Sequence, residues 1–317
     1  MGESRNGDAK FRGRVLIVGT VSNVSKRLRA DFTSIKNAFS DNFEVFTYLV
    51  ESDSSDETLA ALNDLSISNK NFSFVSFGDL KNSIPDRVER IRYCRNQYVR
   101  YIRDRYETHK WDYIVVADLD GMNGALTKAA VKSCFTRLDW DCCLSNQTGG
   151  YYDIFALRES TWQPRNYFEE VEVARAKIRN LELRKPFFLD RFRLLLLEDS
   201  IKKKAIYAKM KRIPKGSSWV SVDSGFGGLA IYKPHVFLSF DYSKLNSQSR
   251  DSEHVDLHLR MKDDGNKIFI NPDFVNSHWN TYNVNRFFIV RQVRRLIWNN
   301  RTLHSFAKQF KAYLARH

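Results

Sequence analysis

The chain has 317 residues, of which 43% are apolar and 14% aromatic, so it can bury a substantial core and is not a disordered protein. Its net charge is +14, but residues 175–215 carry +10 and residues 285–317 carry +8, which leaves −4 for everything else. The positive charge therefore belongs to two segments of a slightly acidic body. No apolar run approaches the ~20 residues of a membrane span, and the polar N-terminus predicts no signal peptide.

The four cysteines, Cys94, Cys134, Cys142 and Cys143, lack the spacing of a zinc site. Cys142 and Cys143 are adjacent within an apolar run that is typical of a buried strand. We therefore expect reduced, structural cysteines and a cytoplasmic location for the chain.

The first half of the sequence alternates short apolar runs with amphipathic stretches. This pattern predicts a doubly wound α/β sheet, in which ligands bind at the carboxyl ends of the strands. Two of the four predicted strand exits are acidic, and none carries a glycine-rich phosphate loop, which disfavours a dinucleotide dehydrogenase or a P-loop kinase. The predicted strands are 14–18, 44–50, 71–77 and 113–117, and the predicted helices are 25–39, 57–64 and 86–107, the last with Asp86 as its N-cap.

The second half is less regular. The patterns predict two strands within 142–157, helices over the basic segment 165–212, strand–turn–strand over 219–233, a helix at 252–261, a strand at 267–275 broken at Pro272, and an amphipathic helical tail over 285–314.

Asp118 and Asp120 are the strongest local signal, because they follow the apolar strand YIVVA directly. Two carboxylates one residue apart can bind one hard cation such as Mg²⁺ or Mn²⁺, with water and phosphate oxygens as the other ligands. The alternative is that Asp-x-Asp stands at this strand end by chance, with one residue capping the next helix.

Arg87, Arg90 and Arg95 lie on the helix that precedes this strand, and arginine suits bidentate contact with a diphosphate. The alternative is a solvated helix face that pairs with Glu89. At the second strand exit, Glu51 and Asp53 can accept hydrogen bonds from a nucleobase or ribose, or can serve only the turn and the following helix cap.

Seven sequence blocks, in their order and spacing over roughly residues 12–280, resemble those of GT-A glycosyltransferases, and among them the fungal capsule-associated α-1,3-mannosyltransferase family and its bacterial and viral relatives. The resemblance implies an α/β GT-A fold (Rossmann-like, with a mainly parallel central sheet flanked by helices), a helical basic insertion and C-terminal amphipathic helices. The blocks are VESDSSDET, RVERIRYCRN, the strand with Asp118-Leu119-Asp120, YYDIFALR, VDSGFGGLAIYK, SEHVDLHLR and INPDFVNSHW.

The resemblance also implies roles for individual residues. Asp118, Asp120 and His278 match the metal ligands, Glu253 the catalytic carboxylate with Asp251 beside it, and the glycines 225, 227 and 228 an acceptor-side loop. The implied nucleotide-sugar site comprises Glu51, Asp53, Arg87, Arg90, Arg95, Asn96, Asp118 and Asp153, and the implied acceptor loop comprises Gly225, Gly227 and Gly228.

The sequence thus predicts a Mn²⁺- or Mg²⁺-dependent glycosyltransferase that moves a hexose from GDP-mannose or a UDP-sugar to a glycan or lipid-linked acceptor in polysaccharide or glycoconjugate synthesis. The catalytic domain is expected over 12–284, with a nucleotide-sugar half (1–141), an acceptor half (142–284) and a basic helical insertion (165–215). The basic tail, 285–317, is expected to place the chain peripherally on the cytoplasmic face of an anionic membrane or to pack on the catalytic domain.

Two other functions are compatible with parts of the sequence. A sugar-nucleotide nucleotidyltransferase also uses paired carboxylates on an α/β sheet, but its phosphate loop is rich in glycine, whereas GTVSNVSKR here contains one. A nucleic-acid-binding protein would explain the basic helices and would be expected to interleave aromatic stacking platforms with the charge. The sequence shows no RNP-like or helix-turn-helix pattern and the body is acidic, so no nucleic-acid partner is expected.

Overall fold

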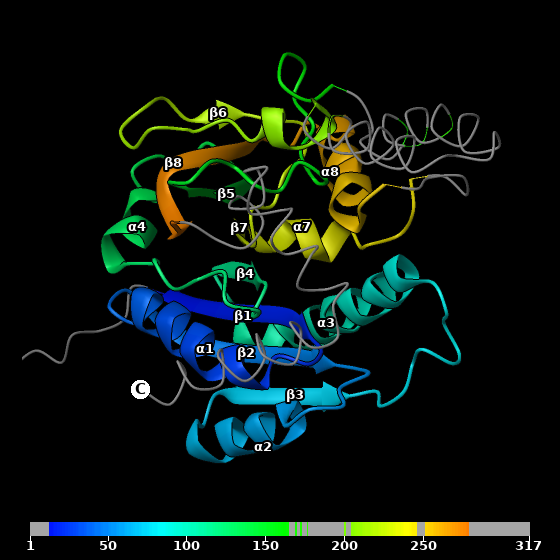
Figure 1. Ribbon diagram of the computed structural model, residues 1–317. Helices are drawn as coiled ribbons and strands as arrows, with labels where there is room; N and C mark the ends of the chain where they lie inside the picture. The colour runs from blue at the N-terminus through cyan, green and yellow to red at the C-terminus, as the bar shows by residue number, and fades with distance from the viewer. Residues whose placement is uncertain are drawn as a thin grey trace, which may run out of the picture.

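The computed structural model describes residues 13–164, 204–245 and 251–278, together with the single positions 169, 172, 176 and 200. These residues build one eight-stranded sheet in the order β3-β2-β1-β4-β7-β5-β8-β6 (Figure 1). The strands are β1 (Gly13–Val21), β2 (Phe43–Glu51), β3 (Phe72–Ser76), β4 (Tyr113–Ala117), β5 (Cys142–Gln147), β6 (Val220–Ser221), β7 (Leu229–Tyr232) and β8 (Ile268–Ser277).

Helices cover both faces of this sheet. One hydrophobic core joins the sheet to α1, α2 and α4, and the other joins it to α3, α7 and α8. The helices are α1 (Ser25–Phe39), α2 (Thr58–Ser68), α3 (Arg87–His109), α4 (Lys128–Ser133), α7 (Pro234–Ser239) and α8 (Glu253–Asp263), with a single 3₁₀ turn, η1 (Tyr207–Lys209), in the described part of the basic segment.

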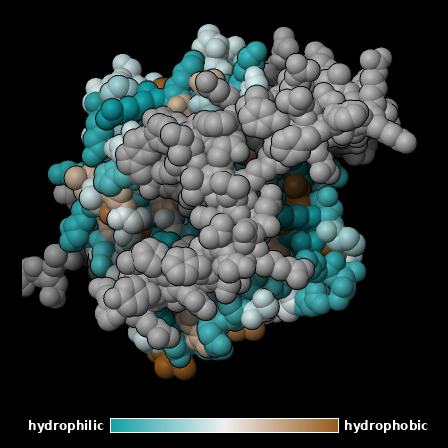
Figure 2. All heavy atoms as spheres, viewed as in Figure 1, coloured by the Kyte–Doolittle hydropathy of each residue, from teal (hydrophilic) through white to brown (hydrophobic). Residues whose placement is uncertain are grey.

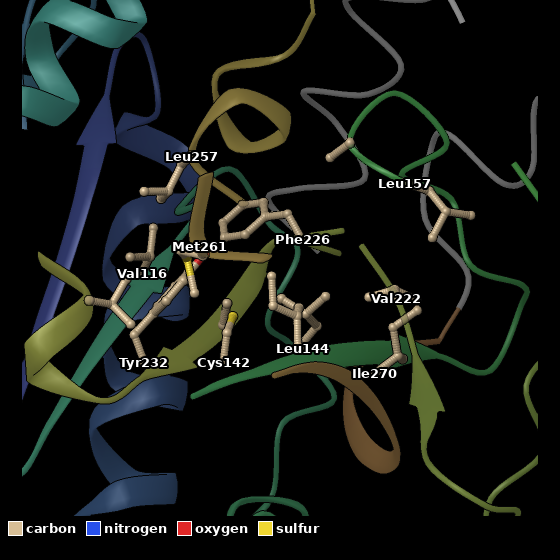
Figure 3. Packing of buried hydrophobic residues seen from close by; sticks show 14 of the residues in the cluster. Val116, Cys142, Leu144, Leu157, Val222, Phe226, Tyr232, Leu257, Met261 and Ile270 are labelled. Carbon is tan, nitrogen blue, oxygen red and sulfur yellow. The ribbon is translucent and has the colours of Figure 1, made fainter. Parts of the chain in front are cut away.

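The central strands are buried on both faces, which is why they read as continuous apolar runs. In β4, Ile114 and Val116 enter the core under α3 and α8, while Val115 and Ala117 enter the core under α1. Figure 3 shows part of the core under α3 and α8, where Leu257 of α8 lies near residues of the strands beneath it. The sheet is therefore well packed on both faces, and the loops described below follow the carboxyl ends of its strands.

The prediction of a mainly parallel α/β sheet flanked by helices is confirmed. The pairings β3–β2, β2–β1, β1–β4 and β5–β8 are parallel, and β7 runs antiparallel between β4 and β5. The predicted limits of β4 and α1 coincide with those observed, and Asp86 caps α3 by accepting hydrogen bonds from the N–H groups of Val88 and Glu89 at 2.8 and 2.9 Å.

Two predictions in the second half are wrong. Residues 151–157 form turns and not a second strand. The buried Tyr151 donates from its backbone N to the Lys211 carbonyl at 2.9 Å, and its hydroxyl accepts from Phe226 N at 2.9 Å. The strand β8 continues through Pro272 instead of breaking there. The missing N–H of this proline falls where the β5–β8 register shifts, and the Asn146 side chain donates to the Pro272 carbonyl at 2.9 Å.

Most of the two basic segments lies outside the described residues, so the predicted helices over 165–203 and the tail over 285–317 are not placed here. Among the helices that the structure describes, none has the length and apolarity needed to cross a membrane. The described surface in Figure 2 is mostly hydrophilic.

Candidate functional site

The turn that follows β4 presents two carboxylates at the carboxyl end of the parallel sheet. Leu119 is 2% exposed and anchors the turn in the core, so the flanking side chains point away from that core. The Asp118 side chain is 34% exposed and Asp120 lies at the surface. The structure therefore offers both carboxylates to a ligand at the place where a doubly wound sheet binds one.

Asp31 of α1 holds this turn from below and was not identified from the sequence. Its carboxylate is 3% exposed and accepts hydrogen bonds from the N–H groups of Gly121 at 2.6 Å and Asn123 at 3.4 Å. Burial raises the pKa of Asp31, while these backbone donors lower it. The signal in the sequence was an acidic residue on the apolar stripe that Leu28 and Ile35 define.

Arg95 of α3 is the buried cation of the site. Its guanidinium is 5% exposed, donates from Nε to Glu253 Oε1 at 3.0 Å, and has Nη2 at 3.6 Å from Asp118 Oδ1. The rings of Phe226 and Tyr242 each lie 5.5 Å from it. One arginine thus joins the first aspartate of the turn to the first residue of α8.

Negative charge outweighs this single guanidinium. Burial raises the pKa of Asp118 to about 7; Arg95 opposes the shift, and the nearby carboxylates of Asp120, Asp153 and Glu253 reinforce it. Asp118, Asp153 and Glu253 therefore share one buried arginine, while the next carboxylate on the turn, Asp120, interacts with Arg27. The excess negative charge around Arg95 favours a cation at this place.

Asp153 is held by the backbone around it. Burial raises its pKa to about 6, although hydrogen bonds from the N–H groups of Gly227 at 3.2 Å and Ala156 at 3.3 Å lower it. Asp153 thereby connects the turns after β5 with the glycine loop that precedes β7.

These raised pKa values predict how stability depends on pH without a metal. The pKa values of Asp118 and Asp153 rise from 3.8 to about 7 and about 6, so between about pH 4 and pH 7 the folded state binds more protons than the unfolded state. Urea unfolding in EDTA should therefore show stability falling as pH rises through this window. Asp118→Asn should flatten that slope, and an unchanged slope would contradict the assignment.

The glycine loop 225–228 is buried and lies against neighbouring backbone and side chains. Phe226 N donates to the Tyr151 hydroxyl at 2.9 Å, and Asp118 N donates to the Gly228 carbonyl at 2.9 Å. A Cβ on Gly225 would lie 2.8 Å from the Tyr151 hydroxyl, and one on Gly227 would lie 2.9 Å from the Ser145 carbonyl. The close approach that requires glycine is thus to the fold itself, and the acceptor-contact role of the loop stays a prediction.

Gly227→Ala and Gly216→Ala form a matched test of that packing. Their φ angles are +73° and +74°, but a Cβ on Gly216 would meet nothing within 4 Å. We expect Gly216→Ala to cost about 1–2 kcal/mol for the left-handed backbone, and Gly227→Ala to cost roughly a further 1–3 kcal/mol for overpacking. Urea unfolding measures both, and equal costs would rule out the close packing.

The start of α8 is tied down by arginines. Glu253 is 8% exposed and paired with Arg95, whereas the Asp251 carboxylate pairs with Arg158. Arg92 pairs with Asp256 and also donates to the Asp251 carbonyl at 3.1 Å. The pairing with Arg158 gives Asp251 a structural contact, and the catalytic roles of Glu253 and Asp251 stay predictions.

At the β2 exit, the two predicted base- or ribose-binding carboxylates are already engaged within the protein. Glu51 is 1% exposed and accepts from Ser54 N at 3.0 Å and from the Ser76 hydroxyl. Asp53, with φ +62°, accepts from Lys81 N at 2.8 Å. Both carboxylates hold the shape of this exit, and direct contact with a nucleotide stays a prediction.

The predicted donor-binding residues of α3 are placed differently from one another. Arg87 is exposed, whereas Arg90 donates to the Ile84 carbonyl at 2.7 Å and lies 3.4 Å from Asp53. Asn96 accepts from Tyr242 N at 2.8 Å and so joins α3 to the segment before α8. Only Arg95 reaches the carboxylates after β4.

His278 lies one residue beyond the end of β8, is exposed, and has Nδ1 at 3.0 Å from the Thr148 hydroxyl. Within the ranges that the structure describes, no three His, Cys, Asp or Glu side chains are grouped as a metal site. Asp118 and Asp120 supply hard oxygen ligands on one turn, and the role of His278 as a third ligand stays a prediction.

Comparison with known proteins gives structural matches alone. No protein-family model and no curated protein matches the sequence. One similar structure is the mannosyltransferase PcManGT from Pyrobaculum calidifontis in complex with GDP-Man and Mn²⁺, with 12% identity, coverage of 85% of this chain and 58% of that chain, and a TM-score of 0.42. A second is TarS of S. aureus, with 11% identity, coverage of 83% of this chain and 59% of that chain, and a TM-score of 0.41. A third is glucosyl-3-phosphoglycerate synthase from Mycobacterium tuberculosis in complex with Mn²⁺, UDP and phosphoglyceric acid, with 11% identity, coverage of 84% of this chain and 67% of that chain, and a TM-score of 0.37. The chain thus spans 58% and 59% of the first two. Because all three scores are below 0.5, we infer function from the geometry of this chain.

Proposed function

We propose that this chain is a GT-A glycosyltransferase that transfers a hexose from a nucleotide sugar to a hydroxyl acceptor. One observation carries the proposal: the carboxylates of Asp118, Asp153 and Glu253 gather around one buried arginine at the carboxyl end of the sheet, and Asp120 follows on the same turn. A diphosphate cannot enter such a site without a cation to offset the repulsion, and Asp-x-Asp on a strand exit suits that cation.

The residues fit a divalent ion by their donor chemistry. Asp118 and Asp120 would hold Mn²⁺ or Mg²⁺ through oxygen, and burial and mutual repulsion already raise the pKa of Asp118. When bound, the metal neutralises charge on the leaving diphosphate as a Lewis acid.

Glu253 is the candidate base for the acceptor hydroxyl. A positioned carboxylate can accept a proton from a sugar hydroxyl as the glycosidic bond forms. The Nε–H of Arg95 fixes one of its oxygens at 3.0 Å and leaves the other with the Ser252 hydroxyl at 3.4 Å. Arg95 thus orients Glu253.

A screen of donors tests the proposal. Thermal unfolding should be monitored with GDP-mannose, UDP-glucose and UDP-galactose, each with Mn²⁺ and each with EDTA. We expect one nucleotide class to raise the Tm in Mn²⁺ and to lose that effect in EDTA, because linkage stabilises the state that binds. The absence of any Mn²⁺-dependent shift across the series would count against a sugar-nucleotide site.

The acceptor class and the location of the enzyme are further parts of the proposal. A glycan or lipid-linked acceptor in polysaccharide or glycoconjugate synthesis would suit a chain whose basic tail, 285–317, contacts an anionic membrane at its cytoplasmic face. The tail lies outside the described residues, so the proposal rests on its composition, which includes eight basic residues and no acidic one.

Liposome sedimentation tests this tail. Each basic side chain near an anionic surface contributes about 1 kcal/mol, so deleting 285–317 should strongly reduce binding to vesicles with phosphatidylserine. Vesicles of phosphatidylcholine alone are the control, and binding of the full chain should fall with salt. Equal sedimentation of both forms would refute the membrane contact.

A further inference from the structure

Behind the site, three buried side-chain amides form one directed chain of hydrogen bonds. Gln147 Nε2 donates to Asn276 Oδ1 at 2.9 Å, Asn276 Nδ2 donates to Asn123 Oδ1 at 3.3 Å, and Asn123 Nδ2 donates to the Asp118 carbonyl at 2.5 Å. The amides come from β5, from β8 and from the turn after β4, and each residue is 0% exposed. The chain therefore runs across the sheet and ends on the backbone of the candidate metal ligand.

The same amides hold the glycine loop. The Gly227 carbonyl accepts hydrogen bonds from Gln147 Nε2 at 2.9 Å, Asn276 Nδ2 at 3.0 Å and the Ser145 hydroxyl at 3.0 Å. Three donors converge on one carbonyl, which leaves the Gly227 peptide no room to rotate without breaking several bonds.

The backbone on either side of that peptide contacts two site residues. The Gly228 carbonyl accepts a hydrogen bond from the backbone N–H of Asp118 at 2.9 Å, and Gly227 N donates to the Asp153 carboxylate at 3.2 Å. The position of Gly227 therefore governs the separation of Asp118 and Asp153, and the amides govern the position of Gly227.

The amides cannot contact a ligand directly, because none of them reaches the surface. Burying an amide is unfavourable unless it is paired, and a paired network is rigid because each member depends on the others. One member is incompletely paired: Gln147 Oε1 has no hydrogen-bond partner among the described residues. The position of the Gln147 side chain therefore follows from the two hydrogen bonds that its Nε2 donates, to the Gly227 carbonyl and to Asn276 Oδ1.

We propose that Asn123, Gln147 and Asn276 are positioning residues that fix Asp118 and Asp153 relative to each other for sugar transfer. The inference rests on the proposed function and adds residues that never touch the substrate. Since a misplacement of about 1 Å can lower a rate about 100-fold, loosening this chain should affect turnover more than nucleotide binding.

Asn276→Leu and Asn271→Leu form the matched pair that tests this proposal. Both asparagines lie on β8 with 0% exposure, but Asn271 donates to Ser133 of α4, away from the site. Both variants should lose comparable stability. We expect the kcat of Asn276→Leu to fall about 10- to 100-fold. The Kd for UDP or GDP with Mn²⁺, measured by calorimetry, should change less than about threefold, because the variant keeps every carboxylate that would hold the metal and alters only their spacing.

Asn271→Leu should keep the kcat of the wild-type chain, and a kcat for Asn276→Leu within threefold of it would overturn the positioning role. If Asn276→Leu does not fold, Gln147→Met is the second variant, because it removes two of the donated hydrogen bonds with little change in volume. It should likewise lower kcat while leaving Kd nearly unchanged. A wild-type kcat in Gln147→Met would then overturn the proposal. A wild-type chain without Mn²⁺-dependent turnover would instead overturn the proposed function and this inference with it.

Discussion

Asp120→Asn should abolish transfer while leaving the fold intact. Asp120 lies at the surface, and its carboxylate is offered to the cation by a turn that other residues hold. Removing one charged ligand removes several kcal/mol of stabilisation of the developing charge, so we expect kcat/KM to fall about 10³-fold or more. Nucleoside diphosphate release in Mn²⁺ measures the effect.

Asp104→Asn is the control for that variant, because Asp104 is also exposed but lies on α3 near its C-terminal end. Both variants should unfold within about 0.5 kcal/mol of the wild-type chain, as exposed substitutions usually do. An active Asp120→Asn would show that the turn after β4 does not bind the cation.

Arg95→Met should cause the largest loss of stability. Arg95 is buried between Asp118 and Glu253, so its removal leaves the buried Glu253 and the partly buried Asp118 without their cation. Breaking a buried pair by removing one partner costs roughly 3–5 kcal/mol. Urea unfolding at pH 8 measures this, with Arg100→Met, an exposed arginine of α3, as the control that should change little.

The loss from Arg95→Met should shrink at low pH. Arg95 lowers the pKa of Asp118, so its removal raises that pKa above about 7 and makes the charged form still less favourable in the fold. At pH 5 the carboxyl of Asp118 is protonated in the folded variant and needs no cation, so the cost there should be smaller. An equal cost at pH 5 and pH 8 would argue that Arg95 acts through packing on Phe226 and Tyr242 alone.

The parts of the fold that the sequence predicts are those with a strong local cause. The apolar run Tyr113–Ala117 is buried on both faces, and Asp86 satisfies two N–H groups at the start of α3, so β4 and α3 could be recognised without the rest of the chain. The antiparallel place of β7 between β4 and β5 depends on contacts between distant segments, and no local pattern reports it.

The residues of the candidate site also fall into those that the sequence reveals and those that it does not. Asp118 and Asp120 stand out because carboxylates directly after an apolar strand are conspicuous in the sequence. Asn123, Gln147 and Asn276 do not, because a polar residue in a strand or turn is unremarkable until the sheet brings the three together. Their function lies in an arrangement across three elements and not in any one of them.

Mn²⁺-dependent release of nucleoside diphosphate from a sugar nucleotide is the most direct test of the central claim. The purified chain should be incubated with GDP-mannose and with UDP-hexoses in Mn²⁺, in EDTA, and in EDTA followed by excess Mn²⁺. We expect release with one donor class, loss of release in EDTA, and recovery when Mn²⁺ is restored. Release that is equal in EDTA and in Mn²⁺, or no release from any donor, would contradict a cation-dependent glycosyltransferase built on Asp118 and Asp120.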